Sequence, residues 1–205
     1  MKAKSDIFTV SNSAGTHFRK HYDRGDLPIV IRHGARCVLE WKACVDSIDI
    51  VYFLPLFVDG IREQQNPYRF VSSEGTFQLI DGGCATKILS CVSNLIYPLK
   101  RALSTNHSTT IILALRVIQS LTLKSPEIAE ALIPFYKQLL PIFNVYKSRK
   151  RNIGDEIDFA QFKHDGRTLG ETIEETLTIL EQTAGPCASA QIKKIVPTYE
   201  HIHAA

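Results

Sequence analysis

Asp59 and Glu63 are the two residues whose types and spacing come nearest to a catalytic pair. They stand four residues apart in the stretch YFLPLFVDGIREQQNPYRF, residues 52–70. On a helix this spacing puts two carboxylates on one face, where like charges shift pKa values in the way that acid–base catalysis uses. The same spacing is common on solvated helix faces. Because the apolar residues around Asp59 recur with helical period, we interpret Asp59 as a capping or hydrogen-bonding group of a packed helix.

No other arrangement typical of catalysis, metal binding or cofactor binding occurs in the chain. The motifs GxSxG, HExxH and GxxxxGK[ST] are missing. The five cysteines include no CxxC pair, which favours reduced and mostly buried thiols over disulfides or a zinc site. His201 and His203 have no third ligand nearby in the sequence. We therefore predict no catalytic residue, no metal, no cofactor and no enzymatic activity.

Trp41, the single tryptophan, is the first residue that points to binding instead. It stands between charged residues, at the end of a predicted β-hairpin. Tryptophan buries much apolar area and is enriched among interface hot spots. Packing of Trp41 on the first helix of the domain is an equally good interpretation. The sequence leaves both roles open.

Charge is unevenly distributed along a chain whose formal net charge is only +3. Four cations fall within five residues, at Lys147, Arg149, Lys150 and Arg151, whereas the later segment 171–181 is acidic. The basic run is a solvated loop, a nuclear-localisation-like patch or a docking site for an acidic partner, and composition alone favours the loop. It contains no interleaved aromatic residue and the net charge is small, so we predict no nucleic-acid partner.

Neither a membrane span nor a secretory signal is predicted. The 205-residue chain has no apolar run of about 18 residues. Its first residues also lack the continuous apolar core of a signal peptide. We expect an intracellular protein with no membrane partner.

Residues 1–26 are polar and lack periodicity, so we predict an extended N-terminal arm followed by a single domain over residues 27–205. The domain opens with two short apolar runs, Leu27–Ile31 and Cys37–Trp41, around a Gly-containing loop, which predicts a β-hairpin. From Asp46 onward, apolar residues recur with helical spacing almost to the end. The predicted fold class is therefore all-α.

Local signals mark where some of these helices begin and end. Asp46 or Ser47 is expected to cap the first helix after the hairpin. Gly82-Gly83 is expected to stop a later helix, because glycine takes the left-handed conformation without steric cost. Thr168 and Glu171 have the form of a capping box, which predicts the start of the last long helix.

A weak internal repeat suggests how the helices are arranged. Residues 94–103 (NLIYPLKRAL) align with residues 131–140 (ALIPFYKQLL) at an offset of 37, with Lys100 matched to Lys137. That offset is close to the roughly 40-residue period of armadillo and HEAT repeats. Helix pairs of that kind stack side by side because no single pair buries its apolar face alone. We predict an armadillo/HEAT-like helical solenoid.

Several motifs, taken in order, closely resemble the parkin co-regulated protein family, and together they span nearly the whole chain. The motifs are RGDLPI (24–29), YFLPLFVDGI (52–61), NPYRF (66–70), DGG (81–83), LIYPLKRAL (95–103), IPFYKQLLPIFN (133–144) and VPTYE (196–200). The resemblance implies the same helical solenoid. It also implies a non-enzymatic structural protein of the doublet microtubules of cilia and flagella, which helps to form the inner junction between the A- and B-tubules.

The resemblance further implies the partners and the location. The family alternates along the junction with a small β-rich protein and contacts α/β-tubulin, so the axoneme is the expected location. In mammals the family also pairs with a small meiosis-expressed protein. By resemblance, Trp41 and Asp46 lie on the surface used for that pairing.

No family motif fixes the tubulin contact. Because microtubule surfaces are acidic, we assign this contact to the basic run Lys147, Arg149, Lys150 and Arg151. The alternative to a microtubule protein is a soluble helical-repeat adaptor that binds a small partner protein.

Overall fold

A computed structural model describes residues 15–34, 37–105, 107–147 and 168–199. Helices dominate these residues, which confirms the predicted all-α class. The elements are α1 (His17–Arg24), β1 (Ile29–His33), β2 (Cys37–Trp41), η1 (Val45–Ser47), α2 (Ile50–Gly60), α3 (Tyr68–Gly82), α4 (Ala85–Leu103), α5 (Ser108–Lys124), α6 (Pro126–Leu132), η2 (Ile133–Phe135), α7 (Tyr136–Leu139), α8 (Pro141–Lys147) and α9 (Leu169–Ile195). Within the described ranges, no helix has the length and apolar character needed to cross a membrane.

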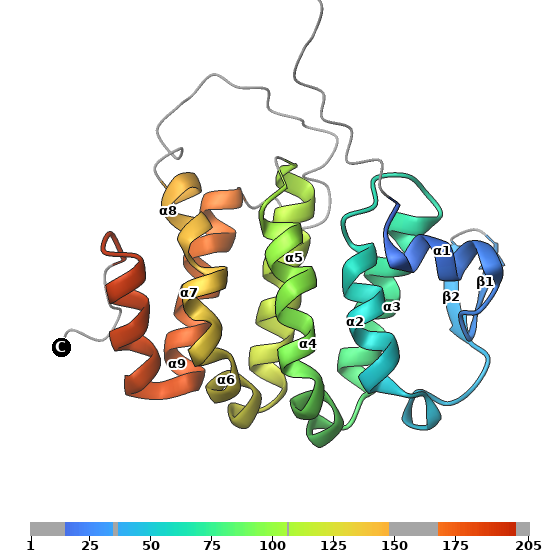
Figure 1. The fold of residues 1–205 in the computed structure, drawn as a ribbon, viewed down its shortest axis with the longest axis horizontal. Helices are drawn as coiled ribbons and strands as arrows, with labels where there is room; N and C mark the ends of the chain where they lie inside the picture. Colours follow the sequence, from blue (N-terminus) through green and yellow to red (C-terminus); the bar gives the residue numbers. More distant parts are fainter. Residues whose placement is uncertain (1–14, 35–36, 106, 148–167, 200–205) are drawn as a thin grey trace, which may run out of the picture.

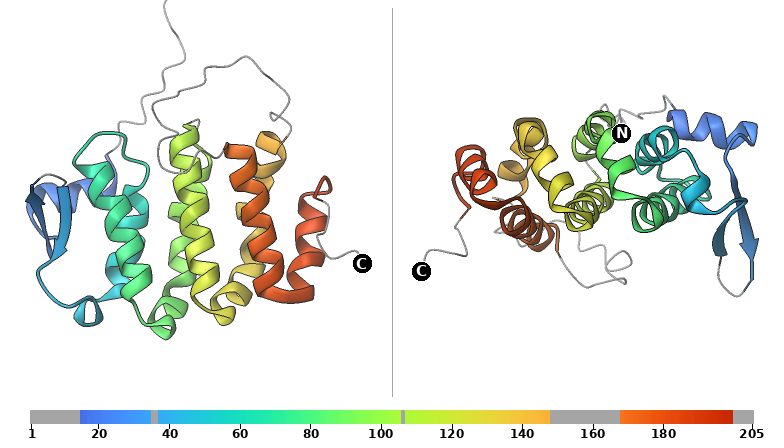
Figure 2. Two further views of the ribbon diagram at one scale, coloured as in Figure 1. Left: turned by 180° about the vertical axis from the view of Figure 1, so that it is seen from behind. Right: turned by 90° about the horizontal axis from the view of Figure 1, so that it is seen from below.

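The helices after the hairpin pack in two layers (Figure 1, Figure 2). One layer holds α2, α4 and the run from α6 to α8, and the other holds α3, α5 and α9. Neighbouring helices touch within each layer and across the two layers, around one buried apolar core. This stacking of helix pairs agrees with the repeat hypothesis. The assignment to armadillo or HEAT units stays a prediction.

The two aligned repeat segments lie in neighbouring helices of one layer. Residues 94–103 belong to α4, and residues 131–140 run from α6 through η2 into α7, all beside α4. Three of the aligned pairs have the same burial in both segments: Leu95 and Leu132 are buried, Leu103 and Leu140 are buried, and Lys100 and Lys137 are exposed. In the fourth pair, Ile96 is buried and Ile133 is only partly buried, so three of the four matched positions have matched environments, as a structural repeat favours.

The predicted β-hairpin is confirmed at one end of the helical layers (Figure 1). β1 and β2 pair antiparallel, with Ile29 opposite Trp41. Since side chains alternate along a strand, the hairpin has two faces. Leu39 on one face is buried in the core, whereas Val30 and Val38 on the other are about half exposed. The hairpin thus closes the end of the core with its inner face.

The predicted extended arm over residues 1–26 is wrong for its last part, because residues 17–24 form α1. Residues 1–14 lie outside the described residues. The aromatic ring of Phe18 is fully buried and packs edge-on against Phe57 of α2, with 5.1 Å between ring centroids. Phe18 is the one buried residue of α1, so the helix shows no periodic apolar pattern in the sequence. Gly25, with φ of 77°, ends it in the left-handed conformation.

The cap of α2 differs from the predicted one. Asp46 and Ser47 form part of the short 3₁₀ helix η1 and do not cap α2. The cap is Asp49, whose carboxylate accepts a hydrogen bond from the backbone N–H of Tyr52 at 3.3 Å. The prediction placed the helix start two or three residues early, because a 3₁₀ turn and a helix cap favour the same short polar residues.

Gly82 and Gly83 end α3 as predicted, but not for the predicted reason. Gly83 has φ of −78°, which any residue can adopt. A Cβ atom at Gly83 would instead collide with the backbone carbonyl oxygen of Leu79. Close approach of the chain to the end of α3 therefore requires glycine here. The capping box of Thr168 and Glu171 is confirmed at the start of α9, with both of its hydrogen bonds present.

Candidate protein-interaction surfaces

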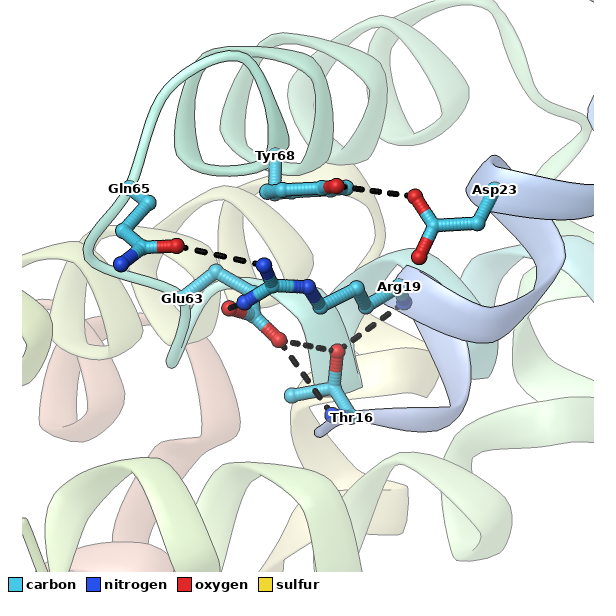
Figure 3. Close-up of polar contacts among 6 residues, drawn as sticks. All are labelled: Thr16, Arg19, Asp23, Glu63, Gln65 and Tyr68. Atoms are coloured by element: carbon cyan, nitrogen blue, oxygen red, sulfur yellow. Dashed lines mark hydrogen bonds and ion pairs between the residues drawn. The ribbon is translucent and has the colours of Figure 1, made fainter. Parts of the chain in front are cut away.

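Asp59 and Glu63 together hold the first turn of α1. Asp59 is buried near the C-terminal end of α2, and its Oδ2 accepts a hydrogen bond from the backbone N–H of His17 at 2.9 Å. Oε1 of Glu63 accepts from the backbone N–H of Thr16 at 3.3 Å and from its hydroxyl at 2.6 Å (Figure 3). Free N–H groups at a helix N-terminus favour negative charge. The two carboxylates that were considered as a catalytic pair anchor α1, which confirms the interpretation of Asp59 as a hydrogen-bonding group.

Cations complete this anchor. Arg62 donates to Asp59 at 2.6 Å, and both side chains are less than a tenth exposed. Arg19 pairs with Glu63 at 3.6 Å, and its guanidinium lies 4.3 Å from the ring centroid of Tyr68 (Figure 3). Each carboxylate therefore contacts one cation and the start of α1, an arrangement that fixes the helix in place.

Trp41 packs against the helices of the domain, which is one of its two predicted roles. Its ring is partly buried and lies 5.4 Å from the ring of Phe57 of α2, centroid to centroid. The indole N–H donates to Oε1 of Gln78 of α3 at 2.7 Å. These contacts join the hairpin to both layers. A contact between Trp41 and a partner protein stays a prediction.

Asp46 lies in η1, close to the same helix that Trp41 contacts. Its side chain is exposed, and its backbone carbonyl accepts a hydrogen bond from Nζ of Lys87 at 3.0 Å. The neighbouring Val45 packs so closely against α3 that a Cβ atom at Gly82 would lie 3.1 Å from its Cγ1. Gly82 is one helical turn from Gln78, the residue bonded to Trp41. The structure thus places the two predicted partner-binding residues along one end of α3.

Of the predicted basic contact, only Lys147 falls within the described residues, as the last residue of α8. Arg149, Lys150 and Arg151 lie outside them. α8 ends at the same edge of the helical layers as α4 (Figure 1). A tubulin contact through this run stays a prediction.

The acidic segment of α9 is narrower than the sequence suggested. Glu171 is exposed, and Glu174 and Glu175 are partly exposed. Glu181 is buried, although it was expected on the same solvated face. The acidic face is therefore confined to the first two turns of α9.

Glu181 holds the C-terminal segment against α9. Its carboxylate accepts hydrogen bonds from the hydroxyl of Ser189 at 2.9 Å and from the hydroxyl of Tyr199 at 2.7 Å. Between them lies a kink at Gly185, where φ is 74°. Burial and, secondarily, the bond to Glu181 raise the pKa of Tyr199 to about 12. The pair fixes the direction of the chain after the kink.

The most uneven stretch of charge was missed by sequence reasoning. Residues 82–126 contain no Asp or Glu, and residues 82–154 contain ten Lys and Arg against two acidic residues. This stretch covers α4, α5 and the run from α6 to α8, the middle of both layers. A search for compact clusters of cations finds the run at 147–151 but misses the lack of Asp and Glu in the residues before it. A count of Asp and Glu in a sliding window detects it.

The cysteines are free, as predicted, but only Cys91 is buried, whereas Cys37, Cys44, Cys84 and Cys187 are exposed. The expectation of mostly buried thiols is wrong because these four lie in the hairpin, at helix starts and beside the kink of α9. Among the described residues, no group of three His, Cys, Asp or Glu side chains is placed to hold a metal ion.

Comparison with known proteins identifies relatives over nearly the whole chain. A family model described as "Parkin co-regulated protein" matches residues 16–201. Among curated proteins, the chain is similar to the "Parkin coregulated gene protein homolog" of Mus musculus. The two are 40% identical over 186 residues, which cover 90% of this chain and 76% of the mouse protein. The match begins at Thr16, so the anchor of α1 lies inside the shared region.

Proposed function

Because the chain belongs to the parkin co-regulated protein family, we propose that it is a non-enzymatic structural protein of axonemal doublet microtubules. In this role it binds α/β-tubulin and helps to form the inner junction between the A- and B-tubules of a cilium or flagellum. Family membership over residues 16–201 is the observation that carries the proposal.

The physical character of the molecule supports this role. Two stacked layers of helices give a small domain a large exposed surface, which suits a protein that must touch several neighbours. The excess of cations over residues 82–154 attracts an acidic filament, while the exposed carboxylates at the start of α9 favour a basic neighbour.

The partners follow from the same family membership. We propose that a small β-rich junction protein lies beside this chain along the axoneme. A small meiosis-expressed type of protein is proposed to bind at Trp41 and Asp46, which the structure places along one end of α3. This last surface also suits the second candidate function, a soluble adaptor that binds a small protein away from any filament.

Localisation tests the main proposal against the adaptor. The tagged chain is expressed in a ciliated cell, which is then extracted with detergent. An axonemal protein stays with the microtubules after extraction and is enriched in the cilium. A protein that is fully extracted, and that recovers one small partner without tubulin, would instead be the adaptor.

Co-sedimentation with microtubules tests the predicted contact. We expect binding that weakens with salt, and that weakens further when Lys147, Arg149, Lys150 and Arg151 are changed to Glu. Binding that neither change affects would rule out the basic run as the contact.

A further inference from the structure

We propose that the outer surface of α4 and α7 is a docking site for a glutamate-rich segment of a partner protein. This surface, called here the α4–α7 basic face, consists of Tyr97, Lys100, Arg101 and Lys137. The proposal rests on the proposed function in one respect, since the acidic surface of tubulin is then the expected source of the segment. It adds a second contact, at residues separate from the basic run at 147–151.

Three of the four residues share one face of α4. Tyr97, Lys100 and Arg101 stand at positions i, i+3 and i+4, which adjoin on a helix surface. Lys100 is exposed, and Tyr97 is 67% exposed. The guanidinium of Arg101 lies 5.7 Å from the ring centroid of Tyr97, within the range of a cation–π contact. An aromatic ring left in solvent beside two cations is typical of binding surfaces rather than of solvated helix faces.

Lys137 adds a third cation on α7, the helix next to α4 in the same layer (Figure 1). Lys100 and Lys137 are matched by the internal repeat, and both are exposed. Axes of packed helices lie about 8–10 Å apart. In an extended peptide, side chains two residues apart point to the same face and are separated by about 7 Å, a gap that the long lysine and glutamate side chains can bridge. A glutamate-rich segment that crosses α4 and α7 can therefore set one carboxylate against each lysine.

The positive charge of this face is not cancelled by its own helices. α4, α5, η2, α7 and α8 contain no Asp or Glu. The acids of the same layer in this part of the molecule are Glu127 and Glu130 of α6, and Glu130 lies two helical turns before Lys137. Among the described residues, no carboxylate forms an ion pair with the three cations.

The same features favour an acidic peptide over a nucleic acid. Tight binding to a nucleic acid uses a broad stripe of cations that neutralise many phosphates. The face offers three cations and one aromatic ring, and the chain as a whole carries a formal charge of only +3. A short acidic segment matches that number of contacts.

The test measures binding of a fluorescein-labelled deca-glutamate peptide to the full chain by fluorescence anisotropy at about 0.05 M ionic strength. The variant is Lys100→Glu with Lys137→Glu. The matched control is Lys193→Glu with Lys194→Glu, which makes the same change in net charge at two exposed lysines near the end of α9. Circular dichroism checks that both variants are folded.

We expect the Lys100/Lys137 variant to lose about tenfold in affinity and the control to lose much less, because screened contacts act only over short distances. Tyr97→Ala weakens binding severalfold, while Tyr97→Phe preserves the ring face and binds like the unchanged chain. An equal loss in the variant and its control would overturn the proposal, since only net charge would then matter. Tighter binding of a poly-uridine RNA than of the peptide would also overturn it.

Microtubule co-sedimentation of the same proteins separates this inference from the proposed function. A chain that sediments with microtubules but does not bind the peptide contradicts the inference alone. A chain that binds the peptide through the α4–α7 basic face, but does not sediment with microtubules, supports the inference and contradicts the proposed function.

Discussion

The buried carboxylate of Asp59 accepts a hydrogen bond from the backbone N–H of His17, 2.9 Å away, and joins residues 42 apart in the chain. Beside it, the carboxylate of Glu63 accepts hydrogen bonds from the backbone N–H and the hydroxyl of Thr16. A helix of eight residues is too short to be stable alone in water. The two carboxylates and the buried ring of Phe18 therefore make α1 part of the domain.

Loss of the Asp59 carboxylate should destabilise the whole domain. Asp59→Ala leaves the guanidinium of Arg62 buried without its partner, and such a loss costs about 3–5 kcal/mol of the free energy of unfolding. Urea unfolding measures it. Glu130→Ala, which removes an exposed carboxylate, is the control and should change stability by less than about 0.5 kcal/mol. Equal stability of the two variants would show that the Asp59 pair does not hold the fold.

Gly60 is needed because the ring of Phe18 occupies the space that a larger side chain would take. A Cβ atom at Gly60 would lie 2.5 Å from Cγ of Phe18 and 2.7 Å from Cβ of Ser72. Gly60→Ala should therefore cost about 1–3 kcal/mol in urea unfolding. In the double variant with Phe18→Ala, the total loss should be smaller than the sum of the single losses, because the main clash is gone. Strict additivity would contradict this account.

Trp41 should contribute to stability and Asp46 should not. Trp41→Phe keeps an aromatic ring against Phe57 but removes the bond to Gln78, so we expect a loss of about 1 kcal/mol. Asp46→Lys changes an exposed side chain in η1 and should leave the midpoint of thermal unfolding nearly unchanged. Asp46→Lys thus tests partner binding without disturbing the fold, and a large shift of its midpoint would disqualify it.

The bond between Tyr199 and Glu181 should be worth about 1–2 kcal/mol, because Tyr199→Phe leaves a buried carboxylate with one donor fewer. Proteolysis should then cut the segment after the Gly185 kink more readily. Lys194→Arg alters an exposed side chain of the same segment and serves as the control. Identical cleavage of the two variants would mean that the bond does not hold the segment.

Stability should fall at high pH through Cys91 and Tyr199. Burial raises the pKa of the Cys91 thiol from 9.0 to about 11, and that of Tyr199 from 10.0 to about 12. Above pH 9 the unfolded chain releases protons that the folded chain retains, so the free energy of unfolding decreases as pH rises toward 11 and 12. Urea unfolding at about pH 8 and about pH 10.5 measures the decline. Cys91→Ala should reduce it, and Cys187→Ala, at an exposed thiol, should not.

Features that depend on residues close together in the chain were predictable from the sequence. The capping box joins Thr168 to Glu171 over a single helical turn. The hairpin follows from two short apolar runs around a glycine-containing loop, and the all-α class follows from helical periodicity after Asp46. In each case the interacting groups are neighbours, so the local pattern already contains the physical cause. The family, too, is readable from motifs in order.

Only the tertiary structure decided the features whose partners are distant in sequence. It turned the end of the predicted arm into α1, because Asp59 and Glu63 reach its first turn from more than forty residues away. It buried Glu181, which bonds Tyr199. It also placed α4, which carries Lys100, beside α7, which carries Lys137. Periodicity along the chain shows which side of a helix is apolar, but it does not show which polar groups of other helices that helix will contact. Those contacts depend on the packing of the two layers. The sequence alone therefore determined the elements that have a local pattern, and the packed fold determined α1 and the contacts between elements.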